Sequence, residues 1–216
     1  MTKKFKLTTD TKMWFGHKLF RIQALIDFGN VKAGELGGYV EKEDNLSHYG
    51  NAWVYENARV CGNALVHENA VVCGSALVHE NAVVCGSARV CGDAVVCGSA
   101  RVCGNAWVCG SARVCGNALV HENAVVRGDA WVCGDALVCE SADYLCIKGL
   151  GSLNRNTTFY KTKDNDIGVV CGCFSGMLDE FVAKVKDRHG DTKYAKEYLA
   201  AVEVVKIHFD KEDHNG

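Results

Sequence analysis

The sequence predicts a mainly β fold, a parallel β-helix of stacked hexapeptide repeats, and three observations predict it. Residues 50–145 read in strict sixes, beginning GNAWVY and ENARVC, through sixteen repeats without one insertion or deletion. Alanine occupies every sixth position from Ala52 to Ala142, and valine follows two places later from Val54 to Val138. The chain contains no proline, and continuous ladders of backbone hydrogen bonds exclude proline because it lacks an N–H donor.

Each hexad is expected to form one short strand and one corner. Ala and Val are two residues apart, so they share one face of a strand, and the residue between them takes the other face. Gly, Asn, Ser and Asp follow, and these types turn a chain because they tolerate positive φ or bond their own backbone. Three sides close a triangular coil of 18 residues, so the repeats amount to about five coils. A helix is excluded because six is not a multiple of 3.6.

The flanking sequences depart from the hexad pattern at both ends. Residues 1–49 are expected to form an N-terminal cap and a degenerate first coil, which protects the open end of the stack. Residues 146–216 are expected to form a small α+β module with a β-hairpin and two helices. The strands and helices expected in these two regions are Phe5–Leu7, Leu19–Phe28, Thr157–Thr162, Ile167–Cys173, Met177–Arg188 and Thr192–Phe209.

Charge and hydropathy exclude several classes of function. Lys and Arg number 24 against 26 Asp and Glu, and residues 50–145 hold five Arg, no Lys and nine acidic residues, a net charge of −4 (5 − 9). That balance would repel a phosphate backbone, so no nucleic-acid partner is expected. No stretch reaches the ~18 apolar residues of a membrane span, and no signal peptide follows Met1, so we expect a cytoplasmic protein without membrane contact.

Cysteine is abundant, with 13 residues, most of them in the position after the repeat valine. That position also accepts Tyr, His and Arg, so it is expected to point outward from a narrow core. Cysteines 18 residues apart form columns with a spacing of ~4.8 Å, longer than the ~3.8 Å between Cβ atoms that a disulfide prefers. We therefore expect reduced thiols, with capture of a metal by thiolates as the alternative.

Several segments resemble a known family of hexapeptide-repeat proteins. The residues that carry the resemblance are Leu19–Leu25, Gly34–Val40, Asn45–Ser47 and the repeated Gly-Asn-Ala-x-Val, and together they cover roughly residues 19–145. That family is common in phages and prophages, and the wider superfamily that it resembles includes hexapeptide acyltransferases and γ-class carbonic anhydrases. The resemblance implies a left-handed β-helix in the cytoplasm of a bacterial host.

The resemblance also implies a non-catalytic binding or scaffold protein with a role in counter-defence, either blocking a host immune protein or sequestering a nucleotide signal. A hexapeptide acyltransferase is one alternative, and a structural or assembly component of a virion is another. Acyltransferases of this superfamily carry a catalytic His on a loop that interrupts the repeats, and they place Gly directly after the aliphatic position. Here no loop interrupts the repeats and Gly comes one place later, which argues against the enzyme.

Histidines recur in a single repeat position, so repetition accounts for them without catalysis. His67, His79 and His121 all stand within Val-His-Glu-Asn-Ala. A carbonic-anhydrase-like site needs three His on one ion, whereas His67 and His121 would lie three coils, or ~14 Å, apart. We therefore expect no catalytic residue, no metal and no cofactor.

The position between Ala and Val points outward and carries many apolar residues, which indicates an interface. We expect a homo-oligomer, a dimer or trimer, whose contacts are made by Leu65, Val83, Leu119, Leu137, Trp53 and Trp131. Arg89, Arg101 and Arg113 would form a belt at mid-height, with Trp107 beside Arg89. An arginine beside an aromatic ring can hold a nucleotide, so these four are the candidate ligand-binding residues.

Overall fold

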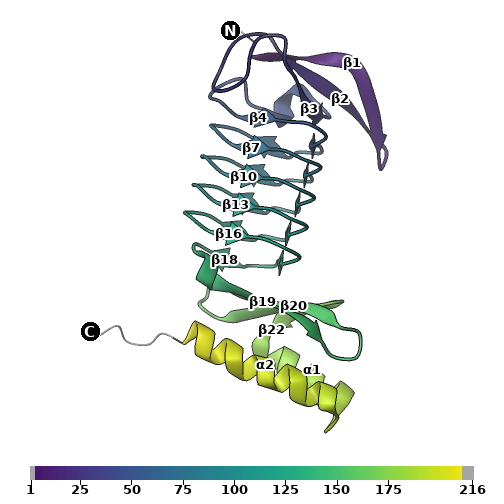
Figure 1. Cartoon of the computed structure of the whole chain (residues 1–216), viewed down its shortest axis with the longest axis vertical. Coiled ribbons are helices and arrows are strands. Elements are labelled where there is room, and N and C mark those ends of the chain that lie inside the picture. The colour runs from purple at the N-terminus through teal and green to yellow at the C-terminus, as the bar shows by residue number, and fades with distance from the viewer. Residues whose placement is uncertain (1–2, 211–216) are drawn as a thin grey trace, which may run out of the picture.

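A computed structural model describes residues 3–210 and confirms the predicted mainly β solenoid. The chain forms a tall column of stacked coils, with a cap at its N-terminal end and a separate sheet with two helices at the other end (Figure 1). Neither helix in the described range combines the length and the apolarity that crossing a membrane requires.

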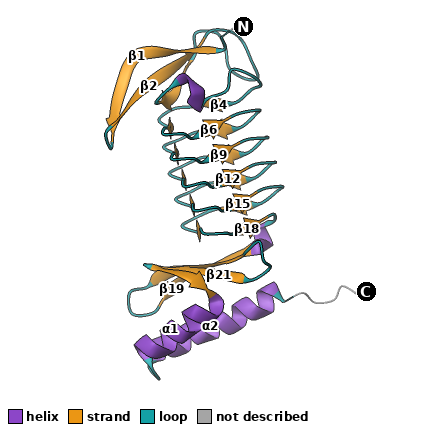
Figure 2. Ribbon diagram, turned by 180° about the vertical axis from the view of Figure 1, so that it is seen from behind, coloured by secondary structure: helices purple, strands orange, loops and turns teal. Residues whose placement is uncertain are grey.

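Fifteen two-residue strands build the column, and they form three parallel sheets, one on each side. The first side consists of β4 (Trp53–Val54), β7 (Val71–Val72), β10 (Arg89–Val90), β13 (Trp107–Val108) and β16 (Val125–Val126). The second side contains β5 (Arg59–Val60), β8 (Leu77–Val78), β11 (Val95–Val96), β14 (Arg113–Val114) and β17 (Trp131–Val132). The third side, labelled in Figure 2, contains β6 (Leu65–Val66), β9 (Val83–Val84), β12 (Arg101–Val102), β15 (Leu119–Val120) and β18 (Leu137–Val138). Paired residues are 18 apart in sequence, as the hexads predict.

The interior of the column is a ladder of small apolar side chains. The repeat alanines from Ala52 to Ala136 and the repeat valines from Val54 to Val138 are at most 1% exposed. Backbone N–H groups donate to the coil ahead, as where the Val95 N–H donates to the Ala112 carbonyl at 2.9 Å. Burying one valine stabilises the fold by roughly 1.5–3 kcal/mol, so repetition supplies most of the stability of the column.

The corners of the column require a left-handed backbone. Most of them hold glycine, such as Gly98 at φ +70° and Gly128 at φ +69°. Glu56, Glu68 and Glu80 take the same place with φ between 56° and 61°. Each of these three carboxylates accepts a hydrogen bond of 2.5–2.7 Å from the glycine N–H one coil on. That charge-assisted bond offsets the left-handed conformation, which costs roughly 1–2 kcal/mol for a residue with a Cβ.

The N-terminal cap is a β-hairpin followed by one partial coil. β1 (Phe5–Trp14) and β2 (His17–Ala24) pair antiparallel, and β3 (Leu36–Val40) pairs with β2 on one edge and with β5 on the other. A short 3-10 helix, η1 (Glu43–Asn45), leads into the first full coil. The first strand is longer than its apolar stretch predicts, because pairing with β2 continues to the tip of the hairpin.

The hairpin lies against the second side of the column and covers part of it. Leu77 on β8 is 7% exposed because it packs with Leu19 and Tyr39 of the cap. Near the tip of the hairpin, the Trp14 ring lies 5.7 Å from the ring of His79. The upper part of this side is therefore covered within the same chain, and sequence reasoning did not anticipate that cover.

The cap also buries the first outward residue of the column. Trp53 is 0% exposed, and its ring lies 6.2 Å from that of Phe5 and 5.2 Å from that of Phe28. A Cβ on Gly37 would lie 2.8 Å from the Trp53 ring, so the chain can pass over this ring only as glycine. The prediction that Trp53 lies at an oligomer interface is wrong, because the cap occupies that surface.

The C-terminal module is a four-stranded antiparallel sheet with two helices. In order, the strands are β19 (Tyr144–Leu150), β20 (Arg155–Lys161), β21 (Ile167–Cys171) and β22 (Phe174–Met177). α1 (Leu178–His189) and α2 (Lys193–Phe209) lie on the side of the sheet away from the column (Figure 1). The module has its own apolar core, centred on Phe159, Val169, Phe181, Tyr198 and Val202. The predicted hairpin and both predicted helices are confirmed.

The last hexad, residues 140–145, departs from the prediction. It forms a 3-10 helix, η2 (Ser141–Asp143), and then the start of β19 instead of a sixteenth strand of the column. Tyr144 stands where the other hexads have valine, and it pairs with Tyr160 on β20. A tyrosine is too large for the interior that valine fills, so the chain leaves the column at this point.

Gly98 and Gly128 have nearly the same φ but different surroundings. Substituting each of them therefore separates the effect of close stacking from that of the left-handed backbone. A Cβ on Gly98 would lie 2.8 Å from the Gly116 carbonyl oxygen, whereas one on Gly128 would meet nothing within 4 Å. We expect Gly128→Ala to destabilise the fold by about 1–2 kcal/mol, and Gly98→Ala by about 1–3 kcal/mol more. Chemical denaturation of both variants measures the difference, and equal losses would contradict close stacking at the corners.

Candidate functional site

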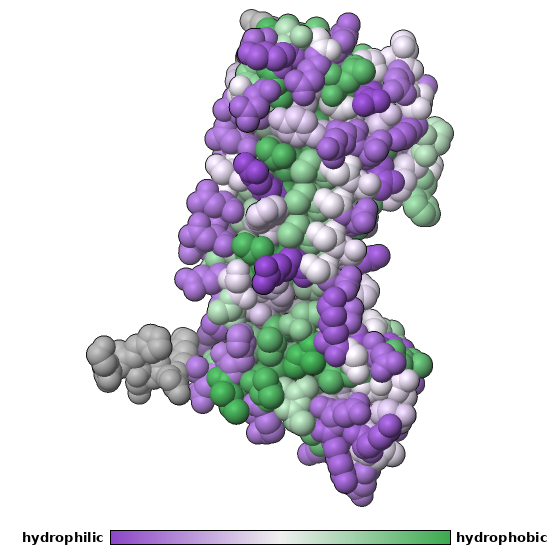
Figure 3. Space-filling view, viewed as in Figure 1, coloured by the Kyte–Doolittle hydropathy of each residue, from purple (hydrophilic) through white to green (hydrophobic). Residues whose placement is uncertain are grey.

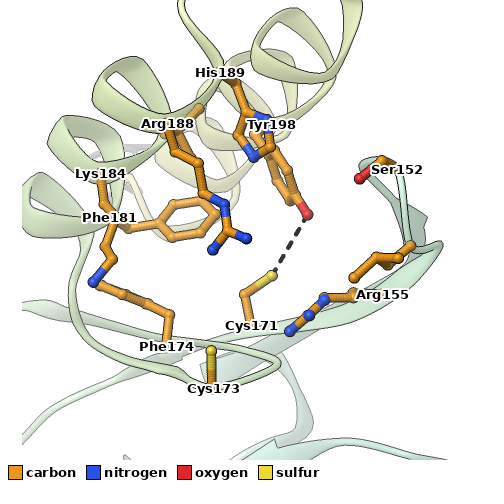
Figure 4. Close-up of a pocket in the computed structure, with 12 residues that line it drawn as sticks. Ser152, Arg155, Cys171, Cys173, Phe174, Phe181, Lys184, Arg188, His189 and Tyr198 are labelled. Carbon is orange, nitrogen blue, oxygen red and sulfur yellow. Dashed lines mark hydrogen bonds between the residues drawn. The ribbon is translucent and has the colours of Figure 1, made fainter.

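A pocket opens in the C-terminal module between the sheet and the helices (Figure 4). It is lined by the loop after β19, by β20, by the turn between β21 and β22, and by both helices. Its volume is about 110 Å³, well below the ~300–1,000 Å³ of pockets that enclose a drug-sized ligand. The pocket therefore suits a small group, or one end of a larger molecule.

Four basic side chains line this pocket, and no acidic side chain does. Arg155 comes from β20, whereas Lys184, Arg188 and His189 come from the second half of α1. Among residues 3–210, neither arginine nor Lys184 forms an ion pair with a carboxylate. The Lys184 ammonium instead lies 5.9 Å from the centroid of the Phe174 ring. The positive charge of the pocket is therefore available to a ligand.

Local structure brings the two guanidinium groups to the same pocket. Lys184 and Arg188 are four residues apart on α1, so they share one face of the helix. Arg155 extends across the turn between β21 and β22, where a Cβ on Gly172 would collide with its guanidinium group. Figure 4 shows the guanidinium groups of Arg155 and Arg188 on either side of the Cys171 thiol.

The floor of the pocket is a hydrogen-bonded group of buried side chains. The Thr157 hydroxyl donates to Cys171 Sγ at 3.2 Å, and the Cys171 thiol donates to the Tyr198 hydroxyl at 3.8 Å. The Tyr198 hydroxyl in turn donates to the Leu150 carbonyl at 3.4 Å. Burial, and then the hydrogen bond from Cys171, raise the pKa of Tyr198 to about 12. Tyr198 therefore remains a neutral hydroxyl at pH 7 and supplies no base to the pocket.

The arrangement is suited to holding an anion that carries a small apolar group. Guanidinium groups bind phosphate and carboxylate oxygens through paired, charge-assisted hydrogen bonds. The rings of Phe174 and Phe181 and the side chain of Val185 supply the apolar part of the lining. A phosphomonoester or a carboxylate next to a ring or a short aliphatic chain matches both halves of this surface.

Sequence reasoning placed the candidate ligand site on the column instead. The structure brings Arg89 and Trp107 together as register neighbours on the first side, with Trp107 44% exposed. The Arg113 guanidinium lies 5.5 Å from the centroid of the Trp131 ring on the second side, and Arg101 lies on the third side. The belt therefore faces three directions, and its arginines do not converge on one ligand.

Of the six residues expected at an oligomer interface, all except Trp53 are at least partly exposed on the outside of the column. Leu65, Val83, Leu119 and Leu137 stack on the third side and are each partly exposed, with Arg101 between Val83 and Leu119. On the face of the column seen in Figure 3, apolar residues alternate with polar ones. Trp131 is 37% exposed.

The cysteine columns differ from expectation at one pair. Cys115 and Cys133 form a disulfide, with their Cα atoms 4.6 Å apart. That distance lies within the ~4.4–6.8 Å that disulfides span, so the prediction of reduced thiols throughout is wrong here. The other eleven cysteines are free, and two of those in the column, Cys61 and Cys85, are buried. Burial raises the pKa of Cys61 and of Cys73 to about 11.

The pocket in the C-terminal module could not be predicted from sequence because several separate segments build it. A partial signal was present in the sequence. Lys184 and Arg188 stand at i and i+4 of the predicted helix, and His189 follows directly. The contribution of Arg155 could not be read from sequence, because it depends on how the hairpin packs against the helix.

Comparison with known proteins bears on the column alone. Residues 58–74, 88–104 and 112–128 match the family model described as the YdcK beta solenoid repeat. The chain is similar to that repeat β-solenoid family. No curated protein matches the chain. The cap and the C-terminal module lie outside the matched stretches.

The raised thiol pKa values predict the order in which the cysteines react. With a pKa of about 11, the Cys73 thiol is almost wholly protonated at pH 8, whereas Cys173 is exposed at the turn between β21 and β22. We expect iodoacetamide to modify Cys173 before Cys73 in the folded protein, and the rate at Cys73 to rise as the pH approaches 11. Peptide mass spectrometry over time measures both rates, with unfolded protein as the control. Equal rates in the folded protein would contradict the raised pKa of Cys73.

Proposed function

We propose that this chain is a non-catalytic binding protein, in which a rigid β-solenoid carries a module that holds a small organic anion. One observation carries the proposal, namely that Arg155 and Arg188 share a pocket that no carboxylate lines. Cationic side chains left without an anionic partner in a protein pocket favour an anionic ligand, because that ligand completes their hydrogen bonds. The ligand class is a phosphomonoester or a carboxylate with an apolar group.

The resemblance to phage and prophage hexapeptide-repeat proteins extends this proposal to a biological role. Within a bacterial host, the anion would be the phosphate end of a nucleotide signal, and binding would sequester it as a form of counter-defence. A pocket of about 110 Å³ suits the phosphate and part of the sugar or base, and the remainder would lie in solvent. Blocking a host immune protein is the competing version, and in that case an acidic side chain of that protein would enter the pocket.

Acyl transfer has less support than binding. Enzymes of the wider superfamily need a loop that leaves the repeats, whereas β4 to β18 succeed one another at six-residue intervals. The three histidines of the column each lie near the glutamate that follows them, at 3.6–3.9 Å. Repetition explains this geometry without a reaction.

Self-association is part of the proposal. A second copy of the chain would pack against the third side of the column. The support is the row of partly exposed Leu65, Val83, Leu119 and Leu137. If the row is the contact, Leu119→Arg will lower the mass measured by light scattering to that of a monomer, because a charge there would be buried without a partner. Val125→Arg on the first side is the matched control and leaves the mass unchanged. Equal behaviour of the two variants would remove this interface.

Two arginine substitutions test the anion pocket directly. We expect the wild-type chain to bind phenyl phosphate and nucleoside phosphates, cyclic ones included, and not the uncharged nucleosides. Arg155→Gln and Arg188→Gln should each weaken binding by about tenfold or more, because a hydrogen bond to a charged group is worth roughly 1.5–3 kcal/mol. Calorimetric titration measures these affinities.

The control for this experiment is Lys186→Gln, which removes a charge from the same helix outside the pocket lining. A loss of affinity equal to that of Arg188→Gln would mean that net charge, not the pocket, attracts the ligand. Failure of every anion to bind the wild-type chain would overturn the proposed function.

A further inference from the structure

A second group of reactive side chains recurs at the corners of the column. Three times a His-Glu pair is followed, 18 residues after the histidine, by a cysteine that lies one coil further along. An imidazole, a carboxylate and a thiol are thereby placed at one corner. The three sets are His67, Glu68 and Cys85; His79, Glu80 and Cys97; and His121, Glu122 and Cys139.

In the last of these sets, the three side chains lie close to one another. Cys139 Sγ lies 3.1 Å from His121 Nε2, and Glu122 Oε1 lies 3.6 Å from His121 Nδ1. One ligand atom from each residue lies within 4.8 Å of the others. His121 and Cys139 are partly buried and Glu122 is exposed, so the cluster is held by the fold and open to solvent on one side.

The end of the column explains why this set differs from the other two. The carboxylates of Glu68 and Glu80 are engaged by the N–H groups of Gly86 and Gly98, each at 2.5 Å. The equivalent N–H for Glu122 belongs to Glu140, and it donates instead to Asp143 Oδ2 at 2.9 Å.

In the described part of the chain, therefore, no backbone N–H donates to the Glu122 carboxylate. The Glu140 N–H is hydrogen-bonded within the η2 turn, so it is not available to Glu122 as the N–H of a regular next coil would be. The exposed Glu122 carboxylate lacks the structural bond of its counterparts and stands beside an imidazole and a thiol, so it can turn toward a ligand that these two groups share.

We propose that His121, Glu122 and Cys139 bind one zinc ion, or a divalent cation of similar softness, with water in the fourth position. Imidazole nitrogen, thiolate sulfur and carboxylate oxygen are the three donor types that zinc takes in proteins. Binding releases the Cys139 thiol proton to solvent, and the thiolate electron pair forms the metal–sulfur bond. The site lies at the end of the column, outside the anion pocket, so it stands or falls independently of the proposed function.

The sequence repeat supplies matched controls for a test. The full chain, kept reduced and freed of metal, is titrated with cobalt(II) as a spectroscopic probe and then with zinc in competition. We expect one equivalent of cobalt to produce a thiolate-to-metal charge-transfer band. Cys139→Ser should remove that band, and His121→Ala should weaken zinc binding by about tenfold or more. Cys85→Ser and His67→Ala, made in a set whose carboxylate is engaged, should leave both unchanged.

A second measurement does not depend on variants that must fold. X-ray absorption of the wild-type chain loaded with one zinc should show a shell of one sulfur and several nitrogen or oxygen atoms. A shell of sulfur alone would mean that the cysteine columns hold the metal, and it would overturn the proposal. Equal loss of the charge-transfer band in Cys85→Ser and Cys139→Ser would overturn it as well.

Discussion

In-register stacking of the coils is the constraint on which every other feature of this protein depends. Each strand has only two residues, so its hydrogen bonds to the neighbouring coils must be aligned before its valine can be buried. The corners tighten this requirement, because a Cβ on Gly86 would lie 2.8 Å from the backbone of Gly104. An insertion in one coil would misalign the ladder, the corner and the core together. The uninterrupted run of hexads follows from that coupling.

Because the coils stack in register, the separation of two residues in sequence determines whether they are neighbours in space. Residues 18 apart become neighbours, so Cys115 reaches Cys133 and His121 reaches Cys139. Inside the column, polar groups are matched by the next coil, as the corner glutamates are by glycine N–H groups. Where the repeat stops, this matching by the next coil is lost. Glu122 loses its partner at the last corner, and the basic pocket lies beyond the column altogether.

The hexads alone predicted the column, its register and its apolar interior, because a short exact period leaves few ways to bury alanine and valine. Helical periodicity likewise predicted both helices of the module. The cover over Leu77 and Trp53 could not be predicted, since the path of a hairpin outside the repeat depends on tertiary contacts. The disulfide was missed because an ideal strand spacing was compared with a Cβ distance, whereas the two Cα atoms approach to 4.6 Å. The pocket required Arg155 and Arg188 to meet across the sheet and helix, which no local pattern encodes.

The distribution of charge bears on which anion the module could select. Residues 146–210 carry ten Lys or Arg and nine Asp or Glu, a net charge of +1 (10 − 9), against −4 for residues 50–145. Elsewhere in the module, three lysines are paired with a carboxylate, namely Lys148, Lys161 and Lys206. Screening limits such fields to roughly 8 Å at physiological salt. A compact anion inside the pocket would therefore interact mainly with the basic side chains that line it, whereas a long polyanion would also meet the acidic column. Selection of small anions would then come from the lack of acid in the pocket lining, not from the net charge of the chain.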